Sequence, residues 1–509
     1  MNWGLIICVP GSVEILLPWH GGKANLKPFV KLYGGFEVGD SLRSDRDWEN
    51  NVTVLDGGSS PPGVSVVTIE YAGGCQVDGF TIQNGRSGAD GGGIYCSNAC
   101  AAIANNIISS NHSNNGGGGV YSEDSFVMAS HNTISGNFTG AGDVGGGIWC
   151  RGGGLVLVQD TISGNHASNG GGLYCQNDDY SLPMSVTMLD STISGNDAGW
   201  GGGGVYLYKA SGTIADSTIS GNTAYRYGGG MYLYSSSPEI KGNTMGSNTV
   251  ECSGCGEGVG EGGGMFCSNS DANYNDGTGC NPHITGNKFI DNDGKDHGGG
   301  IALEDEGTIP IIDNNLFVRN HVAGTGGGGV QVRDSDSVII NNTFVENCAS
   351  NTTSTNGNGG AILVRNATAN PLIINNIFYD NTARDANAGN SVACRESATA
   401  SIFYCGAFSH VSGSDSAYHY SLVTPGTGCS VHRIYTGDTP IFVDEANDDY
   451  HLRLPGPAYT PIDQGHDPDS SQYDKVPAAD FDGHLRVDIP TVTNGSGGYC
   501  DMGAFERQP

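Results

Sequence analysis

The chain has 509 residues, of which 22 are basic and 53 acidic, and its net charge of −31 argues against nucleic acids and anionic membranes as partners. Cationic partners, Ca²⁺ among them, remain candidates. No apolar run approaches the roughly 18 residues of a membrane-spanning helix. Residues 1–10 lack the Lys or Arg of a secretory signal, so we expect a leader missing from this sequence or another route of export.

Residues 1–74 are expected to form an N-terminal cap with the first coils. Short apolar runs at 29–33, 52–55 and 64–71 predict strands. The segments LKPFVKLYGGF at 26–36 and NVTVLDGG at 51–58, with Arg46-Asp47-Trp48 between them, are similar to the N-terminal coils of bacterial extracellular right-handed parallel β-helix repeat proteins. This resemblance implies a β-helix located outside the cell.

A repeat fills residues 75–390. Each unit has an apolar residue, an Asn, Asp or Ser, an Ile or Phe, and an Asn at spacings of 3, 2 and 3, as in Ile214, Ser217, Ile219 and Asn222. Self-similarity at a step of 26 residues, such as Asn196 to Asn222, is typical of a solenoid. Alternating apolar residues and helix-breaking triple glycines predict strands. The sequence therefore predicts an all-β fold, a right-handed parallel β-helix of roughly 26-residue coils.

Two columns of side chains are predicted to face the core of the solenoid. The first contains the residue after the glycines: Ile94, Val120, Ile148, Leu173, Val205, Met231, Met265, Ile301, Val330 and Ile362. The second lies two residues further on and includes four cysteines, expected to be buried thiols: Cys96, Cys150, Cys175 and Cys267.

Seven other cysteines lie in loops or in the C-terminal part: Cys252, Cys255, Cys280, Cys394, Cys405, Cys429 and Cys500. We expect these to form disulfides in an oxidising compartment. A zinc site at Cys252-x2-Cys255 is an alternative, although no second CxxC pair accompanies it.

Between the two inward columns lies a column that is predicted to face outward, here named the ring column. It contains Tyr95, Tyr121, Trp149, Tyr174, Tyr206, Tyr232 and Phe266. Stacked rings on adjacent strands could serve only to stabilise the sheet. Alternatively, a long exposed aromatic surface could bind a glycan or another protein. The columns of Asn are expected to be structural ladders.

Charged residues gather in the later coils and are the candidates for catalysis. Glu304, Arg333 and Arg365 share one outward column, with His297 and His321 in nearby turns. Acid–base chemistry on a sugar needs such basic groups or carboxylates. The alternative is a ladder of ion pairs on a solvated face, which would contribute little stability.

From residue 391 the repeat fades into a C-terminal module. The segments DYHLRLPGPAYTPIDQG at 449–465, DFDGHLR at 480–486 and DMGAFE at 501–506 resemble the C-terminal module of choice-of-anchor Q proteins. That family implies a secreted or surface-attached β-helix. Clustered carboxylates suit Ca²⁺, and the candidate ligands are Asp444, Asp448, Asp449, Asp480 and Asp482. Acidic solubilisation of the surface is the alternative.

Together these features predict an extracellular or cell-surface structural or adhesive protein, non-catalytic, with self-association through solenoid ends or lateral faces as one mode of action. The alternative is a secreted protein that binds extracellular polysaccharide, or a polysaccharide lyase or glycoside hydrolase that uses the outer face of the solenoid. No cofactor other than Ca²⁺ is expected.

Overall fold

The structure is a computed structural model. It describes residues 23–408, apart from 38–39, 41, 59–62, 64, 178–182, 254–258, 270–278, 352–357, 385–389, 397, 399 and 404, together with the backbone of short strands nearer the two ends. The chain divides into two compact units, residues 1–238 and 239–509. This division falls within the repeat, so it does not test the expected boundaries near residues 74 and 390. No helix in the described residues is long and apolar enough to span a membrane.

The first unit is built almost entirely of short strands in three sheets, here named A, B and C. Sheet A contains β3 (Ala24–Leu26), β4 (Val30–Tyr33), β6 (Val67–Glu70), β7 (Cys75–Asp78), β10 (Ile94–Ser97), β11 (Cys100–Ala104), β14 (Val120–Ser130), β17 (Ile148–Val158), β20 (Leu173–Gln176), β21 (Ser185–Leu189), β24 (Val205–Tyr208), β25 (Ser211–Ala215) and β28 (Met231–Tyr234). Sheet B contains β5 (Thr53–Asp56), β8 (Phe80–Gln83), β12 (Ile107–Ser109), β15 (Thr133–Ser135), β18 (Thr161–Ser163), β22 (Thr192–Ser194) and β26 (Thr218–Ser220). Sheet C contains β9 (Arg86–Ser87), β13 (His112–Ser113), β16 (Phe138–Thr139), β19 (His166–Asn169), β23 (Asp197–Gly201) and β27 (Thr223–Ala224). An antiparallel hairpin of β1 (Leu5–Val9) and β2 (Ser12–Leu16) precedes them, and η1 (Arg43–Asp45) is a short 3-10 helix.

The second unit repeats the three sheets. Sheet A contains β29 (Glu239–Lys241), β32 (Met265–Ser268), β33 (His283–Thr285), β36 (Ile301–Leu303), β37 (Ile311–Asp313), β40 (Val330–Arg333), β41 (Val338–Ile340), β44 (Ile362–Arg365), β45 (Leu372–Ile374), β48 (Val392–Arg395), β49 (Ala400–Phe403) and β51 (Cys429–His432). Sheet B contains β30 (Thr244–Gly246), β34 (Lys288–Ile290), β38 (Leu316–Val318), β42 (Thr343–Val345), β46 (Ile377–Tyr379), β50 (Gly406–Phe408) and β52 (Tyr435–Gly437). Sheet C contains β31 (Thr249–Val250), β35 (Asp293–Gly294), β39 (His321–Val322), β43 (Cys348–Ala349) and β47 (Thr382–Ala383). An antiparallel pair, β53 (Phe442–Asp444) and β54 (Asp449–Leu452), follows.

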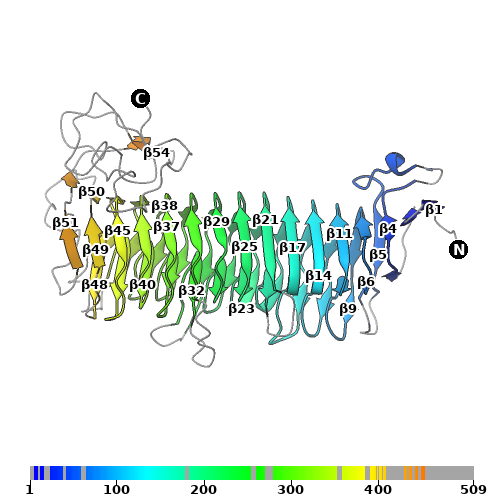
Figure 1. Ribbon diagram of the computed structural model, residues 1–509, viewed down its shortest axis with the longest axis horizontal. Helices are drawn as coiled ribbons and strands as arrows, with labels where there is room; N and C mark the ends of the chain where they lie inside the picture. Colours follow the sequence, from blue (N-terminus) through cyan, green and yellow to red (C-terminus); the bar gives the residue numbers. More distant parts are fainter. Residues whose placement is uncertain are drawn as a thin grey trace. The chain divides into compact units, whose positions relative to one another are not determined.

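Equivalent positions of successive coils pair in parallel within each unit (Figure 1). In the first unit Ile94 lies beside Val120, which in turn lies beside Ile148. In the second unit Ile301 lies beside Val330 in the same way. All ten members of the first inward column are buried. The predicted all-β parallel β-solenoid and its inward column are therefore confirmed, as are the strands expected near residues 29–33, 52–55 and 64–71.

The corners between the sheets explain the recurring polar residues. The position before each ladder Asn has a positive φ, for example Asn105 at 55°, Gly221 at 61° and Asn314 at 53°. Gly, Asn and Asp adopt this left-handed conformation at the smallest cost. At many corners such a residue precedes the Asn that closes the turn, which accounts for the SGN and NN phrases of the sequence. Ser110, His131, Arg319 and Glu346 adopt the same conformation at other corners.

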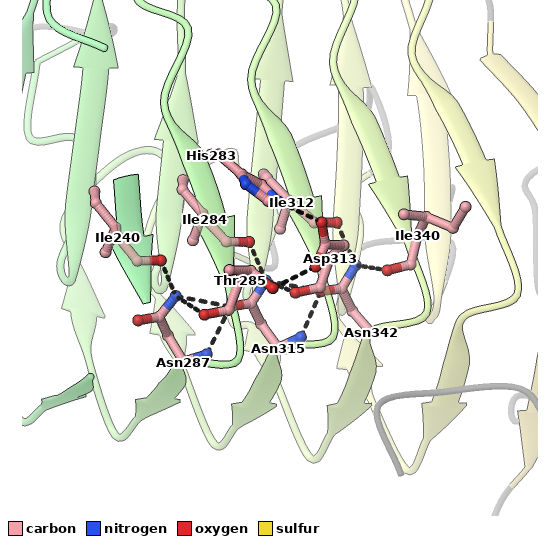
Figure 2. Close-up of polar contacts among 10 residues, drawn as sticks. All are labelled: Ile240, His283, Ile284, Thr285, Asn287, Ile312, Asp313, Asn315, Ile340 and Asn342. Carbon is pink, nitrogen blue, oxygen red and sulfur yellow. Dashed lines mark hydrogen bonds and ion pairs between the residues drawn. The ribbon is translucent and has the colours of Figure 1, made fainter. Parts of the chain in front are cut away.

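The Asn columns form buried ladders, as expected (Figure 2). The backbone N–H and side-chain Nδ2 of Asn287 both donate to Oδ1 of Asn315, at 2.8 and 3.0 Å. Asn315 donates in the same way to Oδ1 of Asn342, at 2.9 and 3.0 Å, and Nδ2 of Asn315 also donates to the carbonyl of Ile284 at 2.8 Å. All three Asn side chains are fully buried. The ladders thus satisfy corner backbone groups that water cannot reach.

The cysteines divide as follows. Cys96, Cys150, Cys175 and Cys267 are buried thiols, which confirms their predicted place in the core. Cys280 and Cys405 are also buried thiols, so the expectation that they form disulfides is wrong. Cys252 and Cys394 are disulfide-bonded, as predicted, to partners outside the described side chains. For Cys255, Cys429 and Cys500, disulfide bonding stays a prediction.

Candidate functional site

The ring column is largely buried rather than open to solvent. Tyr121, Tyr174, Tyr206 and Tyr232 are between 2% and 8% exposed, and Tyr95 and Trp149 are half-buried. In the second unit, Phe266 is 2% exposed. The prediction of a long exposed aromatic surface is therefore wrong for most of these rings.

The glycine turns cover the rings. A Cβ atom placed on Gly116 would lie 2.2 Å from Cε3 of Trp149, a residue of the next coil, and one on Gly145 would lie 2.6 Å from Cβ of Trp149. The turn backbone therefore lies against the faces and stems of the rings, and a side chain there would collide with them. The rings also contact one another, as shown by the 4.4 Å between the ring centroids of Tyr206 and Tyr232.

A smaller group of aromatic residues does reach solvent in the first unit, and we name it the Trp200 patch. Trp200 is 42% and Tyr225 36% exposed, and the guanidinium of Arg226 lies 4.1 Å from the Trp200 ring centroid. Tyr227 lies 6.0 Å from Trp200 and 5.7 Å from Tyr232, measured between ring centroids. Beside Tyr232, the half-buried Tyr208 and Tyr234 stack at 5.1 Å and complete the patch.

A cluster of buried charged residues lies in the second unit and is here named the Glu261 cluster. Glu261 and His297 each precede three glycines, in the turns that lead into β32 and β36, and Glu304 directly follows β36. One potential ligand atom from each of these three residues lies within 4.8 Å of the other two. Arg333 and Arg365, at the ends of β40 and β44, complete the cluster.

His297 is held between a carboxylate and a guanidinium. Arg365 Nη1 donates to His297 Nε2 at 2.8 Å, and because Nε2 accepts, the proton lies on Nδ1, which donates to Glu261 Oε1 at 2.9 Å. The imidazole is 1% exposed, and burial lowers the pKa of His297 to about 4. The ring is therefore neutral at pH 7.

The two carboxyl groups share a small buried space. Burial raises the pKa of Glu261 to about 7. Burial, reinforced by the neighbouring Glu261 charge, raises the pKa of Glu304 well above its ordinary value. At neutral pH the pair therefore carries fewer than two negative charges. Apart from each other, Glu261 Oε2 and Glu304 Oε1 have no hydrogen-bond partner among the described residues.

Two arginines partly neutralise these carboxylates. Arg333 forms an ion pair with Glu304 and lies 3.9 Å from Glu261 Oε1, and Arg365 is paired with Glu396 at 3.2 Å. Arg365 reaches His297 two coils away across Gly326, the equivalent turn residue of the coil between them. A Cβ atom there would lie 2.9 Å from Cα of His297, so the close approach needs glycine.

The other predicted site residues lie elsewhere. His321 is hydrogen-bonded to Asp293 and Ser350, both at 2.8 Å, and makes no described contact with the Glu261 cluster. Of the candidate Ca²⁺ ligands, Asp444 and Asp449 belong to the backbone pair β53 and β54, while Asp448, Asp480 and Asp482 lie outside the described residues. The Ca²⁺ site stays a prediction.

Glu304, Arg333, Arg365 and His297 were predicted from the sequence as site residues, whereas no role was predicted for Glu261. A positional signal for Glu261 exists: it and His297 both stand directly before a glycine triplet, and their turns pair in parallel. Because Glu261 ends a long loop, spacing counted from the preceding ladder Asn hides its equivalence to His297, and only the spacing to the following glycines shows it.

A family model described as the right-handed β-helix region matches residues 63–245 and 147–349. These two overlapping matches cover residues 63–349, more than half of the chain. Neither the curated proteins nor the solved structures contain a match to this chain.

Proposed function

The chain belongs to the right-handed β-helix family, and we propose that it is a structural or adhesive protein that acts outside the cell or on its surface. Its partners would be further copies of itself or an extracellular polysaccharide. In this role the C-terminal module, which resembles that of choice-of-anchor Q proteins, would display the protein on the surface, and Ca²⁺ is its candidate ligand.

The burial of the ring column is the observation that favours a structural role. Tyr121, Tyr174, Tyr206 and Tyr232 contact neighbouring rings or glycine turns instead of solvent. The aromatic rings that recur in successive coils of the first unit thus stack on one another within the protein. A net charge of −31 also suits a protein that must stay soluble in a cation-rich extracellular medium.

Electron microscopy of the purified protein tests the self-association part of this proposal. Ordered filaments or lateral arrays are expected, with their abundance increased by millimolar Ca²⁺ if the C-terminal carboxylates take part. Separate single particles at every Ca²⁺ and protein concentration would rule out self-assembly and leave only adhesion to another partner.

Polysaccharide binding is the second candidate function, favoured by the Trp200 patch. Exposed aromatic rings pack against the apolar faces of sugars, and adjacent cationic groups favour acidic glycans. Trp200 and Tyr225 are exposed, and the half-buried pair Tyr208 and Tyr234 extends the patch. Arg226 and Lys209 supply positive charge next to these rings.

Retention on polysaccharide affinity gels tests this second candidate. Trp200→Ala should reduce retention on acidic polysaccharides by at least about tenfold, which corresponds to about 1.4 kcal/mol. Phe138→Ala is the matched control, because Phe138 is 43% exposed and stacks on His112 in a different sheet C strand. Equal retention of both variants and the unmodified protein would contradict glycan binding by this patch.

A further inference from the structure

We propose that Glu261, His297 and Glu304 bind a divalent transition-metal ion such as Mn²⁺ or Zn²⁺. This inference goes beyond the proposed structural or adhesive role and does not depend on it. It rests on three buried side chains that converge from two adjacent coils of the second unit.

The donor atoms are close enough to hold one ion. Zn²⁺ binds nitrogen and oxygen ligands at about 2.0–2.2 Å, so tetrahedral neighbours lie about 3.4 Å apart. The chosen atoms of the three residues already lie within 4.8 Å of one another. Small side-chain rotations therefore bring them into a coordination shell. One imidazole nitrogen with two carboxylates suits transition metals of borderline character.

The unpartnered oxygens point to a ligand at this place. Glu261 Oε2 and Glu304 Oε1 are buried and have no hydrogen-bond donor among the described residues other than the opposing carboxyl group. Glu261 is fully buried and Glu304 is 6% exposed, so solvent does not compensate them. Buried carboxylates are normally paired or bound to a metal. Backbone pairing between Glu261 and His297 holds their turns side by side.

The arginines define what must move when an ion binds. Ligation through His297 Nδ1 requires the ring proton on Nε2, where Arg365 now donates. Arg365 can keep its ion pair with Glu396. A small movement of the His297 ring or of Asp296 then lets Nε2–H donate to Asp296 Oδ2, which lies 3.6 Å from Nε2. Arg333 contacts Glu304 through Oε2 and leaves Oε1 for the ion. A carboxylate that orients a ligating histidine is a common outer-shell arrangement.

Calorimetry with MnCl₂ on the full-length protein tests the site. Mn²⁺ is the probe because it prefers oxygen and nitrogen donors, so the cysteines compete little. The unmodified protein should bind one more Mn²⁺ ion per chain than either the Glu261→Gln or the His297→Asn variant. Arg365→Gln should bind Mn²⁺ at this site at least as tightly as the unmodified protein, because a competitor for His297 has been removed. The control is His321→Asn, which alters a histidine held by Asp293 and Ser350 and should keep the full stoichiometry.

Anomalous diffraction from crystals of the unmodified protein soaked in MnCl₂ tests the position without any substitution. A peak between Glu261 and Glu304 is expected. Absence of that peak, or a Mn²⁺ stoichiometry unchanged in folded Glu261→Gln and His297→Asn, would overturn the proposal. Sites among the C-terminal carboxylates would persist in all variants and are thereby distinguished.

Discussion

The Asn ladder of the second unit offers a sharp test of what stabilises the coils. Asn315 is fully buried, and its Oδ1 accepts from the backbone N–H of Asn287 at 2.8 Å. Its Nδ2 donates to the carbonyls of Ile284 and Asp313, both at 2.8 Å (Figure 2). Asn315→Ala removes all of these bonds while leaving the apolar core residues in place.

The expected loss follows from the groups left without partners. The N–H of Asn287 loses the acceptor described for it, and the two carbonyls each lose a donor. A buried polar group without a partner costs about 1–3 kcal/mol. Since Nδ2 of Asn287 keeps its bond to the Ile240 carbonyl, we expect a total destabilisation of about 3–5 kcal/mol.

Amide hydrogen exchange under native conditions is the suitable assay, because a solenoid opens locally and a single global unfolding energy is poorly defined. The amide of Asn287 should exchange at least about 100-fold faster, since every 1.4 kcal/mol is tenfold. Asn370→Ala, which alters an exposed Asn of the same unit, serves as the control. A change below about 1 kcal/mol in Asn315→Ala, or one equal to the control, would refute the assignment of stability to the ladder.

Three further predictions concern other buried positions. Burial raises the pKa of Asp160 to about 6 from the usual 3.8, so the charged form is disfavoured in the folded state and stability should fall as the pH rises from about 4 to 6. Asp160→Asn should flatten this change, which is about 3 kcal/mol at most, and melting curves at pH 4 and pH 7 measure it; an unchanged pH profile would contradict the burial argument. Tyr206→Ala, which removes a ring stacked on Tyr232, should cost about 3–5 kcal/mol in urea unfolding, whereas a loss below 1 kcal/mol would show that the ring column contributes little to packing. Gly326→Ala should lower thermal stability by about 1–3 kcal/mol because its Cβ meets His297; unaltered melting would mean that the turn can shift freely.

The sequence was sufficient to predict the fold because residues at equivalent positions of the repeat are the ones that pair between successive coils. Ile94, Val120 and Ile148 recur after their glycines, and the coils pair these residues directly. The Asn ladders were predictable for the same reason. A repeat of fixed period leaves little freedom in how one coil stacks on the next.

The exposure of the ring column could not be predicted from strand alternation. Alternation correctly places Trp149 on the outer face of its strand, but the turn of the neighbouring coil lies against that face. This cover is made by backbone, and glycine leaves no side-chain pattern to reveal it. Alternation alone also could not show that Glu304 is buried, because the side chains near it, Glu261, His297 and Arg333, come from other coils or turns.

The charged cluster was only partly predictable. Glu304, Arg333 and Arg365 fall at equivalent positions of successive strands, so their proximity followed from the register. Glu261 and His297 join them from turns, where loop length varies and the register is weaker. Burial then changes their chemistry, because the raised pKa values of both glutamates depend on surroundings that a linear sequence does not display.

The direction of the hydrogen bonds in the Asn ladder also bears on how such a chain can change in length. In most coils the ladder Asn donates through its backbone and side chain to the oxygen of the Asn one coil later, as in Asn106 to Asn132 and Asn287 to Asn315. Asn132 donates in the same way to Asp160. Loss of one Asn therefore harms the coil before it. Removal or duplication of an entire coil instead joins the same donor to an equivalent oxygen. Duplication or deletion of whole coils can thus lengthen or shorten the protein at little cost to the ladder, whereas a point change at a ladder Asn leaves buried polar groups without partners.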